Sequence, residues 1–146
     1  MRAVVQRVRQ ARVEVAGSCV GQIGPGMLIL LGIHREDGSA EVRVLARRLL
    51  SLKIFQDSSG AMNQSLEELP AAEVLCVSQF TLWGDTLKGR KPSWSRAAPA
   101  PRAEPLYLEF LEILREAGVG VASGIFGADM DVHLINQGPM TLVVES

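Results

Sequence analysis

The chain has 146 residues, of which 47% are hydrophobic and 21% charged, and its formal net charge is −1. This length and composition fit one globular domain, 1–146, with a hydrophobic core; they exclude extensive disorder and argue against broad affinity for nucleic acid. The longest apolar run, 27–31, is too short to cross a bilayer, and the first residues lack the apolar core of a secretory signal, so we expect a cytoplasmic protein with no membrane partner.

Strands and one helix are predicted in the first half of the chain. Residues 13–15 and 19–23 form two predicted strands around a tight turn at Gly17–Ser18, and a turn at 24–26 leads into a buried strand, 27–33. Ser39 is the predicted N-cap of a helix with apolar residues at helical spacing, namely Val42, Leu45, Ala46, Leu49 and Leu50. A short strand at 53–55 and a turn at 57–60 precede a longer predicted strand, 73–82.

A second helix and further strands are predicted in the second half. Pro101 and Pro105 bracket the start of this helix and Gly118 is placed to end it, with an apolar stripe of Leu106, Phe110, Ile113, Leu114 and Ala117. Extended segments at 119–125, 129–134 and 140–145 complete the chain. This order predicts an α/β fold whose two main helices lie on one side of a strand-rich core, without regular βαβ alternation.

Two short polar segments follow apolar strand-like runs. Ser78-Gln79-Phe80-Thr81-Leu82 follows 74–77, and Asn136-Gln137-Gly138-Pro139 follows 132–135. Because sites form where buried strands reach the surface, the two segments together predict a pocket.

The first polar segment has two interpretations. A continuing strand would place Gln79 and Thr81 on one face, with Ser78, Phe80 and Leu82 on the other. Ser78 or Thr81 could act as a nucleophile, but neither histidine of the chain lies in a triad-like motif. The alternative is structural: Thr81 is a good strand former and Ser78 hydrogen-bonds to backbone.

The dipeptide Gly138-Pro139 also allows two interpretations. Cis peptides occur mainly before proline, and a glycine lets the backbone approach a ligand closely. Only about 5–6% of X-Pro bonds in folded proteins are cis, so a plain trans turn is the alternative. The dipeptide alone does not decide between them.

Positive charge is concentrated in one stretch, which holds Trp94 and, with no acid among them, Lys88, Arg90, Lys91, Arg96 and Arg102. This loop suits phosphate contact and base stacking, whereas a solvated surface loop is the interpretation that composition alone favours.

The remaining metal-binding candidates are weak. Cys19 and Cys76 lie in no CxxC or Cys/His spacing, so we expect two small buried hydrophobes rather than a disulfide or a zinc site. Asp129, Asp131 and His133 alternate, but such a row usually marks a wet strand face. We therefore assign no metal and no cofactor.

The residues SQFTL at 78–82 and NQGP at 136–139 closely resemble the two signature motifs of the D-aminoacyl-tRNA deacylases. The resemblance covers the whole chain and includes, in order, Gln6-Arg7-Val8, 24–32, Lys53-Ile54-Phe55, Met62-Asn63, Arg90-Lys91-Pro92-Ser93 and Phe126-Gly127-Ala128-Asp129-Met130. Neither motif is decisive singly, but both in order within a full-length match are highly specific.

This resemblance implies a homodimeric editing enzyme of one α/β domain, layered helix, sheet, sheet. Such an enzyme hydrolyses the ester between a D-amino acid and the terminal adenosine of tRNA and also accepts glycine, as on mischarged tRNA(Ala). The family is thought to use the 2′-hydroxyl of the terminal ribose in catalysis. In the family the Gly-Pro peptide is cis and reaches from one subunit into the pocket of the other, where its backbone oxygens reject L-amino acids.

Carried over residue by residue, the resemblance makes Gly138 and Pro139 the chiral filter and Arg7 the residue that helps hold it. The pocket is nominated to contain Ser78, Gln79, Phe80 and Thr81, with Ala98, Phe126 and Met130 on weaker local matching. Two departures, Met140 after Gly138-Pro139 and Trp83-Gly84 after SQFTL, bear on substrate preference rather than reaction class. The rival interpretations are a Thr81-nucleophile esterase and a non-catalytic RNA-binding module that uses the basic loop.

Overall fold

The computed structural model describes residues 1–87 and 89–146. Its regular elements are β1 (Arg2–Val15), β2 (Ser18–Ile23), β3 (Gly26–Gly32), α1 (Ser39–Leu50), β4 (Phe55–Gln56), β5 (Met62–Gln64), η1 (Leu66–Glu68), β6 (Glu73–Ser78), η2 (Phe80–Trp83), α2 (Ala100–Glu116), β7 (Gly120–Ser123) and β8 (Asp131–Glu145). Here η denotes a 3₁₀ helix. The predicted strand at 53–55 is instead β4, shifted toward the C-terminus.

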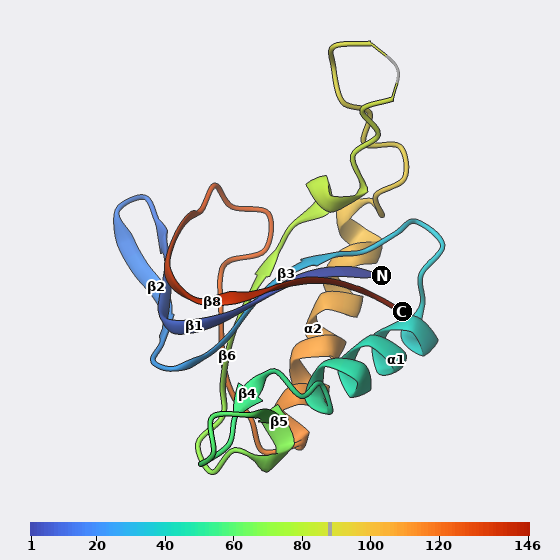
Figure 1. The fold of residues 1–146 in the computed structure, drawn as a ribbon. Helices are drawn as coiled ribbons and strands as arrows, with labels where there is room; N and C mark the ends of the chain where they lie inside the picture. The colour runs from blue at the N-terminus through green and yellow to red at the C-terminus, as the bar shows by residue number, and fades with distance from the viewer. Residues whose placement is uncertain (88) are drawn as a thin grey trace.

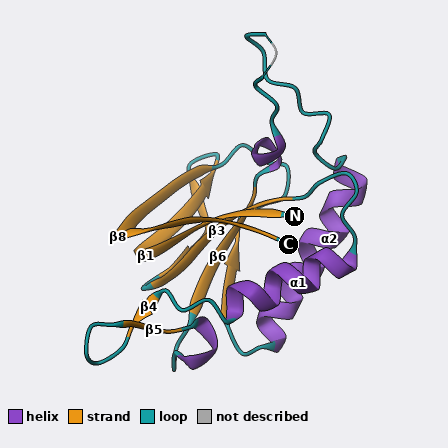
Figure 2. Cartoon of the chain, turned by 45° about the vertical axis from the view of Figure 1, so that its right-hand side comes forward, coloured by secondary structure: helices purple, strands orange, loops and turns teal. Residues whose placement is uncertain are grey.

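The main sheet has the strand order β2-β1-β3-β6-β7, and β8 pairs with β1. Strands β3, β6 and β7 are parallel neighbours, joined by α1 in the first crossover and α2 in the second. Two right-handed crossovers that progress in the same direction place their helices on the same face, as Figures 1 and 2 show. The prediction of helices on one side is confirmed, but the expectation of no βαβ alternation is wrong.

Strand β1 is long enough to serve two parts of the sheet. Residues 2–8 pair with β3 and residues 11–15 pair with β2, while β8 follows β1 from 2 to 14. Strand β2 packs against β7 so closely that a Cβ on Gly21 would lie 2.6 Å from the carbonyl oxygen of Ser123. The sheet thus folds over itself, which produces the helix, sheet, sheet layering.

Two apolar clusters fill the spaces between these layers. On the helix side, Met27, Ile29 and Leu31 of β3 pack with Leu45 of α1 and Phe110 of α2. On the other side lie Val8, Ala11, Val13, Ile23, Leu28, Leu75 and Val77. Because both faces of β3 and β6 are buried, polar side chains reach solvent only where these strands end.

Both helices differ in detail from their predictions. The N-cap of α1 is Gly38, whose N–H donates to the Glu41 carboxylate at 2.9 Å, rather than Ser39. Helix α2 begins at Ala100 and contains both prolines, and its buried residues are Ala103, Tyr107, Phe110, Leu111 and Leu114. Tyr107 replaces a predicted stripe residue because its hydroxyl finds a buried acceptor, the carbonyl oxygen of Cys76, at 2.8 Å.

The two cysteines lie in different environments. Cys76 is buried in β6, and burial raises the pKa of its thiol to about 12. Cys19 is exposed on β2, so the prediction of two buried cysteines is wrong for this residue. It lies in the short β2 hairpin, where the side chain points away from the apolar layer.

Candidate active site

The polar segment after β6 leaves the sheet as a tight turn. Strand β6 ends at Ser78, the Gln79 N–H donates to the Leu31 carbonyl oxygen at 2.8 Å, and 80–83 form η2. The prediction of an extended strand to Leu82 is therefore wrong, because the neighbouring β3 ends at Gly32 and offers no further backbone partner. The side-chain amide of Gln79 donates to the Thr81 hydroxyl across this turn.

Five of the predicted pocket residues line one hollow of about 320 Å³ beside this turn. They are Ser78, Gln79, Phe80, Ala98 and Phe126, and the other lining residues include Leu31, Ile33 and Ala103. The walls are mostly apolar, with Ser78 and Gln79 as the polar side chains. A hollow of this size and composition suits a small organic group held by a few polar contacts.

Met130 and Thr81 lie outside this hollow. Met130 lines a neighbouring hollow of about 280 Å³, in which Ser78, Gln79 and Phe80 form the shared wall. Thr81 is exposed and lines neither of the two. The turn therefore presents 78–80 to both hollows and directs Thr81 outward.

Neither histidine is hydrogen-bonded to a hydroxyl of the SQFT turn. The His34 ring packs on Trp83 with ring centroids 4.6 Å apart, and its Nδ1 accepts the Glu36 N–H at 3.3 Å. His133 lies 3.5 Å from the carboxylate of Glu14 on β1. Within 1–87 and 89–146, Ser78 and Thr81 thus have no paired histidine that would activate them as nucleophiles.

The second polar segment is a tied irregularity inside β8 rather than a turn between two strands. The register of β8 on β1 shifts around Val8, and the Asn136 side-chain amide donates to the carbonyl oxygens of Arg7 and Met140, each at 3.0 Å. The peptide bond between Gly138 and Pro139 is cis, and both residues are exposed.

Arg7 is the buried support of this segment. Its side chain donates to the carbonyl oxygens of Gln137 at 3.3 Å, Gly138 at 3.4 Å and Ile54 at 2.5 Å, and the residue is only 4% exposed. A planar guanidinium can make several such bonds at once, which a lysine cannot. The predicted contact between Arg7 and the Gly-Pro element is thus present.

Within one chain the two polar segments stand at opposite ends of β3. Arg7 pairs with Met27 at the start of β3, whereas Gln79 bonds to Leu31 near its end. The expectation that both segments form one pocket is therefore not met inside a single chain. Strand registers over such distances cannot be read from local sequence.

The basic stretch splits into residues with different environments. Arg90 and Lys91 are exposed, Arg102 donates to the Asp37 carbonyl oxygen at 2.9 Å, and Arg96 lies over the Trp83 ring at 5.3 Å. Lys88 lies outside the described residues. Sequence reasoning missed Arg2, whose guanidinium lies 4.4 Å from the Trp83 ring centroid and donates to the Leu82 carbonyl oxygen at 2.8 Å.

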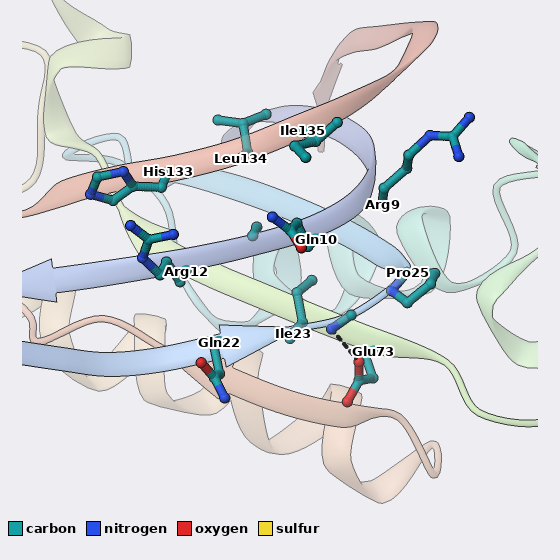
Figure 3. A pocket seen from close by; sticks show the side chains of 12 residues that line it. Arg9, Gln10, Arg12, Gln22, Ile23, Pro25, Glu73, His133, Leu134 and Ile135 are labelled. Atoms are coloured by element: carbon teal, nitrogen blue, oxygen red, sulfur yellow. Dashed lines mark hydrogen bonds between the residues drawn. The ribbon is translucent and has the colours of Figure 1, made fainter.

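A larger hollow of about 720 Å³ lies on another surface, between β1, β2 and β8 (Figure 3). It is lined by polar residues that include Arg9, Arg12, Glu73 and His133, and it contains none of the predicted pocket residues. A hydrogen bond from Arg12 lowers the pKa of the adjacent Glu14. The described part of the chain holds no cluster of three or more histidine, cysteine or acidic side chains placed for a metal ion.

No helix of the described chain has the length and apolar character that a membrane crossing requires.

Comparison with known proteins assigns the family. The family model for D-Tyr-tRNA(Tyr) deacylase matches residues 4–145. The D-aminoacyl-tRNA deacylase of Desulfatibacillum aliphaticivorans is 55% identical over 146 residues, covering 100% of this chain and 99% of the relative. That of Symbiobacterium thermophilum is 51% identical, covering 100% and 96%.

Solved structures agree with this assignment. One described as c-Myc DNA Unwinding Element Binding Protein has a TM-score of 0.91 and 44% identity, covering 100% of this chain and 99% of that one. A probable eukaryotic D-amino acid tRNA deacylase shares the fold, with a TM-score of 0.84 and 24% identity over 99% and 98% of the two chains. The chain belongs to the D-Tyr-tRNA(Tyr) deacylase family, whose members are hydrolases that act on the ester bond of aminoacyl-tRNA.

Proposed function

We propose that residues 1–146 form one deacylase domain that hydrolyses the ester of D-aminoacyl-tRNA and releases the free D-amino acid and tRNA. The observation that carries this proposal is the full-length family match together with the hollow formed by Ser78, Gln79 and Phe80. Glycyl-tRNA mischarged on tRNA(Ala) is a second proposed substrate, because glycine has no side chain for a chiral filter to exclude. A tRNA substrate places the enzyme in the cytoplasm.

The proposed reaction needs no protein nucleophile. A water oxygen adds to the ester carbonyl carbon, the bond from that carbon to the ribose oxygen breaks, and the ribose oxygen takes a proton. The 2′-hydroxyl of the terminal ribose orients the water and passes the proton between the two oxygens, so neither a metal nor a cofactor takes part. This route agrees with the outward position of Thr81 and with its hydrogen bond from Gln79.

The proposed chiral filter is the Gly138-Pro139 segment of a second copy of the chain. The segment is exposed and its carbonyl oxygens are held by Arg7, but it lies at the end of β3 opposite to Gln79. Reaching the Gln79 hollow therefore requires a partner subunit. Rigid carbonyl groups at the hollow would exclude the substituent that an L-amino acid places there.

The outer surface of β8 supports a homodimer. Val143 is 65% exposed and Ile135 is 49% exposed, one on each side of the Gly138-Pro139 segment. Apolar side chains so exposed on one strand are typical of a surface that a partner covers.

One assay tests the reaction. The purified protein is incubated with D-aminoacyl-tRNA, its L counterpart, and a D-amino-acid ester that lacks RNA. We expect cleavage of the D-aminoacyl-tRNA alone. Cleavage of the L form, or none of the D form, contradicts the proposal, and equal cleavage of the RNA-free ester favours a Thr81-nucleophile esterase.

A second assay tests the mechanism. Thr81→Ala should keep most of the activity, whereas a tRNA with hydrogen in place of the terminal 2′-hydroxyl should lose most of it. Ser78→Ala is the matched control for removal of a hydroxyl from the same turn. The opposite pattern, with Thr81→Ala inactive and the deoxy substrate cleaved, would restore the nucleophile.

Mixed dimers test the origin of the filter. Gln79→Ala alters the hollow, and Pro139→Ala releases the φ angle that the ring restrains, which should disturb the filter. If the filter acts across the dimer, a heterodimer of these two single variants contains one intact site and regains D-specific cleavage. A heterodimer of the wild-type chain with the doubly substituted chain should have no intact site. Recovery in the second pairing and not in the first would place the filter in the same chain.

A further inference from the structure

The residues after η2 form an arm that extends from the body of the molecule next to the end of β6 (Figures 1 and 2). Asp85 and Ser93 join its two sides through backbone hydrogen bonds of 2.8 and 2.9 Å. The Asp85 carboxylate accepts the Leu87 N–H at 2.9 Å and so caps the start of the tip. The arm thus has an ordered base beside the proposed catalytic hollow.

Trp94 stands at the base of the arm in a fixed position. Its ring packs on Gly84, where an added Cβ would lie 2.6 Å from the ring, and it meets Phe80 edge-on with centroids 5.5 Å apart and planes at 77°. Trp94 nevertheless remains 42% exposed and Phe80 55% exposed. Phe80 also lines both hollows, so this aromatic pair begins at the rim of the proposed site.

Trp83 cannot offer the same surface. It is only 8% exposed, because Arg2, Arg96 and the ring of His34 pack around it. Of the two tryptophans, Trp94 is the one whose ring is open to a ligand.

The tip of the arm carries positive charge without compensating acid in the sequence. Arg90 and Lys91 are exposed there, and no acidic residue occurs between Asp85 and Glu104. The aromatic pair and these cations therefore lie on one continuous segment that leads away from the hollow.

We propose that Trp94, Arg90 and Lys91 bind the unpaired 3′ strand of the tRNA, upstream of the terminal adenosine. A base of this strand stacks on Trp94, and its phosphates contact Arg90 and Lys91. The proposal rests on the proposed function, since the ester in the hollow fixes where the RNA chain begins. Stacking on an aromatic ring and contact with phosphates do not depend on base identity, which suits an enzyme that must accept different tRNAs.

Kinetics with two substrates of different length test this surface. One substrate is D-aminoacyl-tRNA, and the other is the D-amino-acid ester of adenosine alone, which cannot reach the arm. Trp94→Ala should lower kcat/KM about tenfold for the tRNA substrate and leave the adenosine ester unchanged, whereas Trp94→Phe should retain activity because a stacking ring remains.

The cations are tested by the double variant Arg90→Ala, Lys91→Ala. It should lower kcat/KM for the tRNA substrate by about tenfold at low salt, and reduce the log–log salt slope by roughly 1.4, at about 0.7 for each single-strand phosphate contact. Arg115→Ala is the matched control, since Arg115 is an exposed arginine in the last turn of α2, away from the arm. It should leave both quantities unchanged.

Fluorescence provides a readout that does not depend on catalysis. The chain has two tryptophans, so titration with deacylated tRNA should quench the emission of Trp94, and Trp94→Phe should abolish that quenching. A fold defect would not produce this pattern.

Specific outcomes would overturn the proposal. Equal losses on both substrates for Trp94→Ala would mean that the ring supports the hollow rather than the RNA, and wild-type kinetics on tRNA would mean no contact. If the wild-type protein cleaves neither D substrate, the proposed function fails, while the fluorescence titration still decides whether Trp94 meets RNA. An unchanged salt slope in the double variant would remove the cations from the surface.

Discussion

Gly32→Ala is a direct test of whether the close seating of the SQFT turn matters for catalysis. Gly32 ends β3, directly beside the turn that follows β6. A Cβ at this position would lie 2.9 Å from the Gln79 carbonyl oxygen and 3.0 Å from the Leu82 Cβ. Real Cβ contacts are essentially never shorter than 3.0 Å, so the backbone of the turn must move by a few tenths of an ångström.

The cost of this substitution can be estimated from packing. Overpacking of a well-filled site typically costs about 1–3 kcal/mol. At about 2–4 °C per kcal/mol for a chain of this size, Tm should fall by about 2–10 °C. Since displacement of a positioning group by about 1 Å can cost on the order of 100-fold in rate, we expect kcat/KM to fall about 10- to 100-fold.

The assay combines thermal unfolding followed by circular dichroism with deacylation of D-aminoacyl-tRNA. Gly120→Ala is the matched control: it is also a strand glycine, but its Cβ would make only ordinary contacts, at 3.4 and 3.6 Å. It should preserve both Tm and kcat/KM. A Gly32→Ala protein with wild-type Tm and kcat/KM would refute the view that the turn is held by this close contact.

Three further predictions concern buried groups. Arg7→Ala leaves three carbonyl oxygens without their donor and should lower the free energy of unfolding by about 3 kcal/mol in urea titrations, whereas Arg7→Lys should recover only part of this. Burial raises the pKa of Tyr107 above its ordinary value of 10.0, so the unfolded chain loses this proton first and stability should fall as pH rises above about 10; phenolate absorbance should appear together with unfolding, not before it. Because burial raises the pKa of Cys76 to about 12 and Cys19 is exposed, a thiol reagent at neutral pH should modify one cysteine in the native protein and two after unfolding; rapid modification of both would contradict this.

Local patterns in the sequence predicted the buried elements well. The continuous apolar runs of β3 and β6 are buried strands, and the helical spacing from Val42 to Leu50 is the buried face of α1. The polar residues Ser78 and Gln79 mark the end of a buried strand and line the hollow there. These signals succeed because burial on both faces of a strand, or on one face of a helix, imposes a repeat that is visible over a few residues.

The prediction failed where a distant partner decides the local structure. An extended conformation through Leu82 was reasonable from strand propensity, but the neighbouring strand ends at Gly32 and the chain turns. Met140, a departure from the family pattern, is half-buried against the helix-side cluster, and its carbonyl oxygen accepts a hydrogen bond from Asn136. Neither environment leaves a signal in the adjacent sequence.

The sequence by itself determined the α/β composition, the buried strands and the family, because apolar periodicity and short motifs are properties of neighbouring residues. The tertiary structure alone decided that β3, β6 and β7 are parallel, that Arg7 holds Gly138 from 131 positions away, and that the two polar segments lie at opposite ends of β3. Strand pairing and buried hydrogen bonds join residues that are remote in the chain, and their choice depends on how all layers pack together. For this reason the sequence indicated the parts of a site, and the fold showed that one chain does not assemble them.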